Sequence, residues 1–260
     1  MSGFLATSFL DEVAEWDLFD ANVRLGPSGA QGHLALETDE LLAEMDRFHI
    51  RAALVSHWTG EEYDAAAGND ALARDLRPRL EPAWAALPEM DALSALARLS
   101  PRAVRLTPGK KQHNFSLARW CSDPLLDYLE QSGVVTLVSS QDIGWDELAS
   151  LLDDFPCLQL VLLDLGYRAD RYLFPLLDRY PGLHFDSATY LAHRQLESFI
   201  GQRGAERVLF GSRLPLYTPG SALGVLASAR ISFADRLAVA GGNLRRLLAA
   251  AKSSAPGVLP

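Results

Sequence analysis

Trp16-Asp17-Leu18-Phe19-Asp20-Ala21-Asn22-Val23-Arg24-Leu25-Gly26 is the stretch on which the interpretation of this chain depends. Its apolar residues predict a short strand that ends at the Gly26-Pro27 turn, because strand side chains point alternately to the two faces of a sheet. From Asp20 onward, this alternation places Asp20, Asn22 and Arg24 on one face. Three polar side chains at a strand end can form a site or a solvated edge, and the rest of the chain has to distinguish the two.

Short apolar strands alternate with helical segments about eight times, which is the pattern of a (β/α)8 barrel. Continuous apolar runs at 134–138 and 158–163 are typical of buried parallel strands. Further strands are expected at residues 51–56, 80–87, 103–106, 183–185 and 208–210. Helices are expected from residue 38, at 61–77, 91–99, 123–132, 145–155, 175–180 and 195–204, and from the capping pattern that begins at residue 232. No linker interrupts the pattern, so we predict one α/β domain, a barrel of residues 1–252, followed by a disordered tail at 253–260.

Composition excludes some classes of partner. The chain has 260 residues, 48% hydrophobic and 22% charged, with a net charge of −9 and no Lys/Arg-rich run. Nucleic-acid binding needs clustered cations, and a membrane span needs about 20 apolar residues, so neither partner is expected. The acidic N-terminal segment is unlike a secretory signal, and Cys121 and Cys157 lack paired spacing. We therefore expect a cytoplasmic protein with reduced thiols.

In a (β/α)8 barrel, sites lie at the carboxyl ends of the strands. Polar residues occur at most of the expected strand ends. They are Asn22, Arg24, His57, Arg105, Ser139, Asp164, Asp186 and Arg213.

Five segments carry a resemblance to a known family. Residues 19–26 look like a first-strand motif Asp-Ala-His-x-His-x-Gly, and 207–215 resemble an eighth-strand motif Leu-Phe-Gly-Ser-Asp-x-Pro. Segments 103–109, 161–166 and 242–248 are similar to the fourth strand, the sixth strand and the closing helix of the same family. In order and spacing they resemble the amidohydrolase-related (amidohydrolase 2) branch of the amidohydrolase superfamily. The resemblance implies a single-domain TIM barrel of the metal-dependent hydrolase type, and it suggests a homodimer.

The same resemblance indicates that the metal-binding motifs are degenerate. The family holds its metal with two first-strand histidines, histidines on strands five and six, and an aspartate on strand eight. The matching positions here are Asn22, Arg24, Ser139, Asp164 and Arg213. Arginine has no lone pair to donate and stays protonated, while Asn and Ser are weak ligands. We therefore expect neither a catalytic metal nor another cofactor.

The predicted site residues follow from these positions. Asp164 and His57 are the candidate catalytic groups, and the candidate substrate-binding groups are Arg24, Arg105, Arg213, Asn22, Ser139 and Tyr190. Two interpretations of the arginines stay open, because a guanidinium can hold an anionic ligand or pair internally with Asp20, Asp164 or Asp186.

Three hypotheses about function follow. In the first, a metal-free barrel binds a small anionic, carboxylate-type molecule at its mouth, as a metal-independent hydrolase or lyase (amidohydrolase, lactonase or carboxy-lyase type) or as a catalytically silent relative. In the second, Arg–Asp pairs fill the old metal site of a pseudoenzyme that acts as a scaffold or partner subunit. The third, weaker hypothesis is a metal-dependent hydrolase or decarboxylase with atypical ligands.

Overall fold

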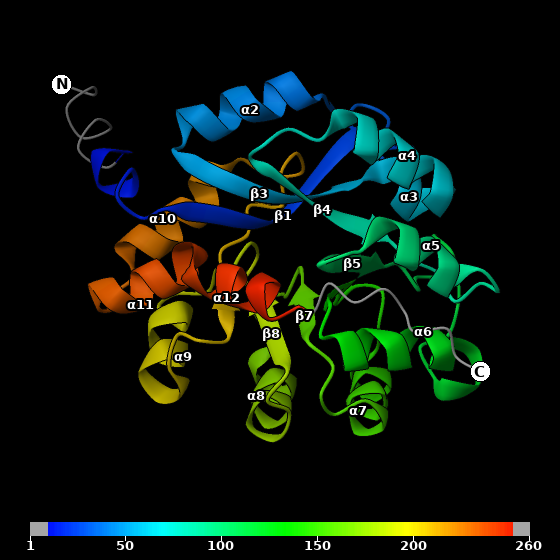
Figure 1. Cartoon of the computed structure of the whole chain (residues 1–260). Coiled ribbons are helices and arrows are strands. Elements are labelled where there is room, and N and C mark those ends of the chain that lie inside the picture. Colours follow the sequence, from blue (N-terminus) through cyan, green and yellow to red (C-terminus); the bar gives the residue numbers. More distant parts are fainter. Residues whose placement is uncertain (1–9, 252–260) are drawn as a thin grey trace.

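The computed structural model describes residues 10–251, so the predicted tail at 253–260 lies outside the described residues. Parallel strands follow one another in chain order, and the short β2 pairs antiparallel with β1 (Figure 1). The strands are β1 (Leu18–Pro27), β2 (Ala35–Leu36), β3 (Ile50–His57), β4 (Leu80–Ala85), β5 (Ala103–Leu106), β6 (Val135–Ser139), β7 (Leu160–Leu163), β8 (Leu183–Asp186) and β9 (Val208–Leu209).

Bonds between β1 and the segment around β9 join the two ends of the sheet. The N–H of Ala21 donates to the carbonyl of Phe210 at 2.8 Å, and that of Arg24 donates to the carbonyl of Leu214 at 3.0 Å. A parallel bridge also pairs Val23 with Leu214. The result is a single-domain α/β barrel with eight parallel strands, β1 and β3 to β9, as the alternating pattern predicted.

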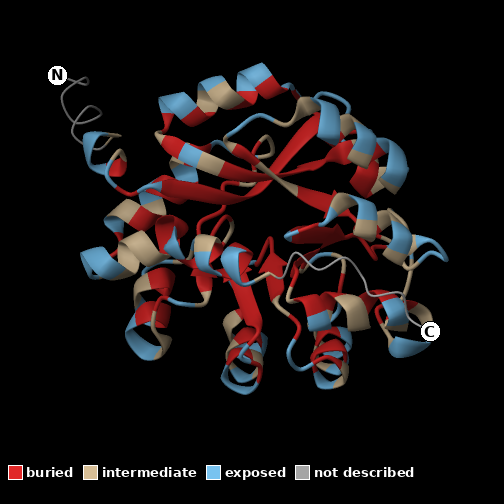
Figure 2. Cartoon of the chain, in the orientation of Figure 1, coloured by how far each residue is buried: buried red, intermediate tan, exposed pale blue. Residues whose placement is uncertain are grey.

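Helices surround the strands (Figure 1). They are α2 (Thr38–Arg47), α3 (Trp58–Glu62), α4 (Ala65–Asp75), α5 (Ala92–Leu99), α6 (Arg119–Ser132), α7 (Trp145–Asp154), α8 (Asp170–Arg179), α9 (Gln195–Arg203), α10 (Pro219–Ser228), α11 (Phe233–Leu237), the π-helical turn η1 (Ala238–Gly242) and α12 (Asn243–Ala250). Buried residues concentrate on the strands and exposed ones on the outer faces of the helices (Figure 2). Within the described part of the chain, no helix has the length and apolarity that a bilayer span requires.

Two hydrophobic clusters stabilise this arrangement. The larger one fills the layer between strands and helices, and the smaller one fills the barrel interior with side chains such as Phe19 and Leu137. Helix α12 contributes Leu244 and Leu248 to the interior cluster. Arg245 of α12 donates to the carbonyl of Asp17 at 2.9 Å, directly before β1, so α12 closes the amino-terminal end of the barrel. The polar strand ends lie at the opposite end.

A β-bulge in β1 breaks the even alternation that the sequence predicted. Asp20 pairs with Ala53 and Val23 pairs with Val55, so Ala21 and Asn22 together oppose a single residue of β3. Ala21 remains in the interior cluster, and Asn22 still projects into the polar end of the barrel. Asp20 does not share that position, because its Oδ1 accepts the N–H of Asn22 at 3.0 Å and that of Ser212 at 2.9 Å.

Some predicted boundaries were wrong. The helix expected at 61–77 is divided into α3 and α4, and Asp64 caps α4 by accepting the N–H of Ala67 at 2.9 Å. Helix α6 begins before Pro124, because the Ala118 carbonyl already accepts two N–H groups of the first turn. Helix α8 is longer than predicted at its start, and α10, which begins at Pro219, was not predicted although proline at the first helical position is a start signal.

Candidate functional site

Polar side chains at the carboxyl ends of the strands form one hydrogen-bonded and ion-paired cluster, which we call the mouth network. All of its members are buried except Arg213, whose side chain is 13% exposed. They are Asn22, Arg24, Ser56, Glu61, Arg105, Ser139, Asp164, Asp186 and Arg213. Six of the eight predicted site residues belong to this network: Asn22, Arg24, Arg105, Ser139, Asp164 and Arg213.

Arg24 is the cation at the centre of the mouth network. Its Nε donates to Glu61 Oε2 at 3.0 Å and its Nη1 donates to Asn22 Oδ1 at 3.1 Å. Its Nη2 lies 3.6 Å from Asp164 Oδ2 as an ion pair, and the guanidinium lies over the ring of Trp58 at 4.9 Å. Every nitrogen of the Arg24 guanidinium therefore has a protein partner, so this side chain acts as an internal counter-ion.

Asp164 is the anion that connects the most members. Its Oδ1 accepts Asn22 Nδ2 at 3.1 Å, and its Oδ2 accepts Ser139 Oγ at 2.9 Å. The Arg213 Nε lies 2.7 Å from Asp164 Oδ1, as an ion pair without hydrogen-bond alignment. Asp164 and Arg213 have φ values of 60° and 61°, in the left-handed region that non-glycine residues seldom adopt. These conformations turn both side chains from the strand ends into the mouth.

Glu61 is a network member that sequence reasoning missed. Its Oε1 lies 3.1 Å from Arg105 Nε and accepts the hydroxyl of Ser56, while Oε2 binds Arg24. The residue stands on the short α3 rather than on a strand, which is why a survey of strand ends did not include it. One available signal was electrostatic, because two buried arginines and the largely buried Arg213 at one barrel end require more buried carboxylates than Asp164 alone.

Two further carboxyl groups are buried without a guanidinium ion pair among residues 10–251. Asp186 accepts Asn22 Nδ2 at 2.9 Å and the N–H of Asp164 at 3.0 Å. Burial, together with the nearby charge of Asp164, raises the pKa of Asp186 to about 7. Burial likewise raises the pKa of Asp20 to about 6. Asp186 is thus partly protonated near neutral pH, which lowers the negative charge of the mouth, whereas Asp20 lies outside the mouth network.

The residues present do not fit a divalent metal ion. Guanidinium groups of Arg24 and Arg213 lie against Asp164, where a cation would compete with them. Asn22 directs its amide nitrogen at Asp164 and Asp186, and its oxygen accepts from Arg24 and Arg105. Between residues 10 and 251, no group of three or more His, Cys, Asp or Glu side chains is placed to hold a metal ion.

The structure does not bring His57 into the mouth network. Strand alternation directs Ser56 inward, and His57 therefore faces outward. Its Nδ1 accepts the N–H of Thr59 at 3.2 Å and caps α3. Its ring lies against Gly26, where an added Cβ would stand 2.3 Å from Nε2, so this position needs glycine. Burial lowers the pKa of His57, which makes its neutral form dominant at neutral pH.

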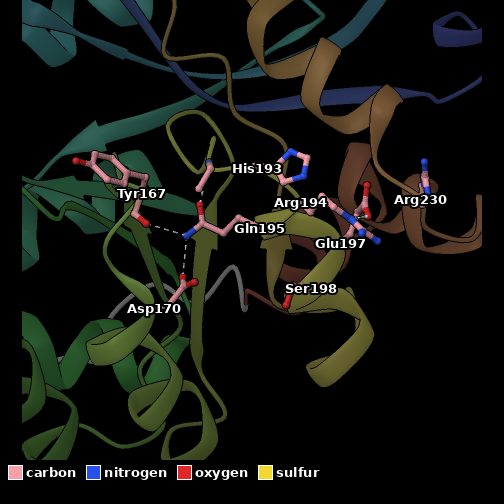
Figure 3. A pocket seen from close by; sticks show the side chains of 9 residues that line it. Tyr167, Asp170, His193, Arg194, Gln195, Glu197, Ser198 and Arg230 are labelled. Carbon is pink, nitrogen blue, oxygen red and sulfur yellow. Dashed lines mark hydrogen bonds and ion pairs between the residues drawn. The ribbon is translucent and has the colours of Figure 1, made fainter.

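Tyr190 also lies apart from the network, next to a pocket formed by other residues. Its hydroxyl donates to Asp170 Oδ1 at 2.6 Å and its ring contacts Phe185 edge-on. This pocket of 780 Å³ lies between the loops that follow β7 and β8 and the first turn of α9 (Figure 3). Gln195 donates there to the carbonyl of Tyr167 at 3.2 Å and to Asp170 at 2.9 Å, so the polar groups of this wall bind one another.

No family model and no curated protein matches this sequence. Solved structures match it over most of the chain. An uncharacterised TIM-barrel protein, Bb4693 from Bordetella bronchiseptica, is 17% identical with a TM-score of 0.72, covering 90% of this chain and 99% of that one. The 5-carboxyvanillate decarboxylase LigW from Sphingomonas paucimobilis is 16% identical, with a TM-score of 0.69 and coverage of 90% and 99%.

A dihydroxybenzoic acid decarboxylase from Polaromonas sp. JS666, with bound manganese and the inhibitor 2-nitroresorcinol, is 15% identical, with a TM-score of 0.71 and coverage of 89% and 96%. Two structures named as amidohydrolases match with TM-scores of 0.67 and 14% identity. The fold is that of the amidohydrolase-type barrels. This confirms the fold that the five sequence segments implied. In this chain, guanidinium groups lie at the mouth of the barrel.

Proposed function

We propose that this protein is a metal-independent barrel whose mouth binds a small anionic molecule of the carboxylate class. The observation that carries the proposal is the state of Arg105. Its Nε pairs with Glu61, but its Nη2 is buried and has no hydrogen-bond partner in the described part of the chain. A buried guanidinium N–H without an acceptor is costly, and an anionic oxygen would satisfy it.

Charge balance supports the same proposal. The mouth network contains three guanidinium groups, whereas its ion pairs involve only the carboxylates of Glu61 and Asp164. Each of these two carboxylates is therefore shared between two of the arginines. An anionic oxygen at Arg105 Nη2 would add a partner that neither carboxylate supplies.

Structures with a similar fold include proteins named for small carboxylate substrates. Two of the similar structures are named as decarboxylases of 5-carboxyvanillate and 2,6-dihydroxybenzoate, and the second is a complex with 2,6-dihydroxybenzoate. Barrels of this shape can therefore accommodate small carboxylates. That support concerns the shape alone, since the identities are 16% and 18%.

We favour binding over catalysis. Asp164, the candidate base, accepts Asn22 and Ser139 and is ion-paired with two arginines, so none of its oxygens is available to take a proton from water. His57 caps α3 outside the network. The side chains of the mouth do not fit a metal ion that could activate water instead.

A thermal-shift screen tests the proposal. Acetate, benzoate and succinate should raise the melting temperature in a saturable way, because a ligand that binds only the folded form stabilises it. Neutral amides of the same acids serve as controls. The variant Arg105→Gln should lose the response, whereas Arg119→Gln, at an exposed position, should keep it. Absence of any carboxylate-specific shift in the unaltered protein would refute the proposal.

A different observation favours a second candidate function. All three guanidinium nitrogens of Arg24 have protein partners, which is what a purely structural network would show. Under this alternative the protein is a pseudoenzyme that acts as a scaffold or partner subunit. It predicts that no anion changes the melting temperature, while loss of Arg24 still destabilises the fold.

A further inference from the structure

Eight buried side-chain polar atoms in residues 10–251 have no hydrogen-bond partner, and three of them are donor atoms around Arg24 that also lack an ion pair. They are Trp58 Nε1, Arg105 Nη2 and Thr107 Oγ1, and none has a hydrogen bond to any residue between 10 and 251. The three residues are only 6%, 3% and 2% exposed. Native proteins leave few buried polar atoms unpaired, so three in one region indicate that something outside the chain satisfies them.

The chemistry of these groups restricts what that can be. An indole N–H and a guanidinium N–H can only donate, and a threonine hydroxyl can donate as well. A partner for all three must therefore present acceptors, and a negatively charged oxygen is the acceptor that forms the strongest bonds with such donors.

Contacts within the mouth network place the donors in one region. The guanidinium of Arg24 lies over the Trp58 ring at 4.9 Å and also binds Glu61, which in turn holds Arg105 at 3.1 Å. Thr107 directly follows the strand that carries Arg105. Trp58 directly follows β3, and β4 lies between β3 and β5.

Strand β4 lies between β3 and β5 and carries small residues on its interior face. Ala83 belongs to the interior cluster, and Ala85 stands two residues further toward the mouth on the same face. Neither alanine has a polar side-chain group that could serve as an acceptor for the three donors.

We infer that Trp58, Arg105 and Thr107 form a subsite for one carboxylate group of the ligand, with the indole N–H, the free guanidinium N–H and the hydroxyl as its donors. This inference rests on the proposed function and assigns the contacts that recognise the ligand. Arg24 supports the subsite from behind, through Trp58 and Glu61, without contacting the ligand.

Indole NMR tests the inference directly. The chain has five tryptophans, so ¹⁵N-tryptophan labelling gives five indole N–H signals, and the one missing from Trp58→Phe is that of Trp58. Titration with acetate or benzoate should shift this proton downfield in a saturable way. The signal of Trp120, which is 83% exposed, should not move, and benzamide should have little effect.

Two conservative variants keep the test independent of folding. Trp58→Phe keeps an aromatic ring beneath Arg24 and removes only the N–H, and Thr107→Val replaces the hydroxyl by a methyl group. Each should weaken benzoate binding by about tenfold or more, the loss expected for a hydrogen bond to a charged acceptor. Trp120→Phe is the matched control and should bind as the unaltered protein does.

The outcomes separate the two proposals. Carboxylate binding that neither Trp58→Phe nor Thr107→Val weakens would overturn the subsite and leave the proposed function standing. An equal response to benzamide and benzoate would also overturn it, since the donors would then not select an anion. Failure of both anions to bind the unaltered protein would overturn the proposed function itself.

Discussion

Replacing Arg24 by methionine removes the central cation of the mouth network and keeps a similar apolar stem. The change leaves Glu61 and Asp164 without one of their partners and Asn22 Oδ1 without one donor. Breaking a buried ion pair by removing one partner costs about 3–5 kcal/mol, because the remaining charge stays buried.

The structure places Arg24→Met at the lower end of that range. Glu61 keeps Arg105 at 3.1 Å, and Asp164 keeps Arg213 at 2.7 Å, so neither carboxylate is left wholly uncompensated. We therefore predict a loss of about 3 kcal/mol in the free energy of unfolding. For a chain of this size, that corresponds to a fall of about 6–12 °C in melting temperature.

Urea denaturation at pH 7 and pH 5 measures this loss. The loss should be smaller at pH 5, because Glu61, whose pKa burial already raises, can take up a proton once Arg24 is gone. Arg119→Met is the control, since the ion pairs of Arg119 with Asp123, Asp127 and Asp154 are all exposed and their loss should cost less than about 1 kcal/mol. An Arg24→Met variant that loses no more than this control would refute the view that Arg24 is a buried counter-ion.

Three other predictions follow from the same contacts. Asp20 and Asp186 have pKa values raised to about 6 and about 7, so the folded state binds more protons than the unfolded chain between about pH 4 and 7. The free energy of unfolding should therefore fall as the pH rises through this window. In urea titrations, Asp186→Asn should make this pH dependence weaker. Arg213→Gln should weaken carboxylate binding measured by calorimetry and cost about 1 kcal/mol of stability, since this side chain is the most exposed member of the network. His57→Ala should cost about 1 kcal/mol through loss of the α3 cap while His57→Asn does not, and neither should change carboxylate affinity; a loss of affinity in both would return His57 to the site.

The barrel could be predicted from the sequence because its determinants are local. Apolar runs such as 134–138 and capping residues such as Ser232 specify strands and helices one at a time, and Ser232 does accept the N–H of Asp235 at 3.0 Å. Parallel strands then place their carboxyl ends on one side. For this reason the order of the strands along the chain was enough to expect Asn22, Arg24, Asp164 and Arg213 near one another.

The missing parts of the site depend on features that carry no local pattern. The bulge at Ala21 and Asn22 contains no glycine, so nothing marked the shift in register. Glu61 enters the mouth from α3, a helix of five residues that is too short for apolar periodicity to predict. The placement of His57 outside the network could have been anticipated, because alternation in β3 separates it from Ser56.

Our central proposal is that the guanidinium groups at the barrel mouth, which pair with its carboxylates, leave the mouth unable to hold a divalent ion. Elemental analysis of protein purified without chelator, from cells grown with added zinc and manganese, measures this most directly. We predict substoichiometric metal and a melting temperature that EDTA does not change. One zinc or manganese ion per chain, lost on substitution of Asn22 or Asp164, would contradict it.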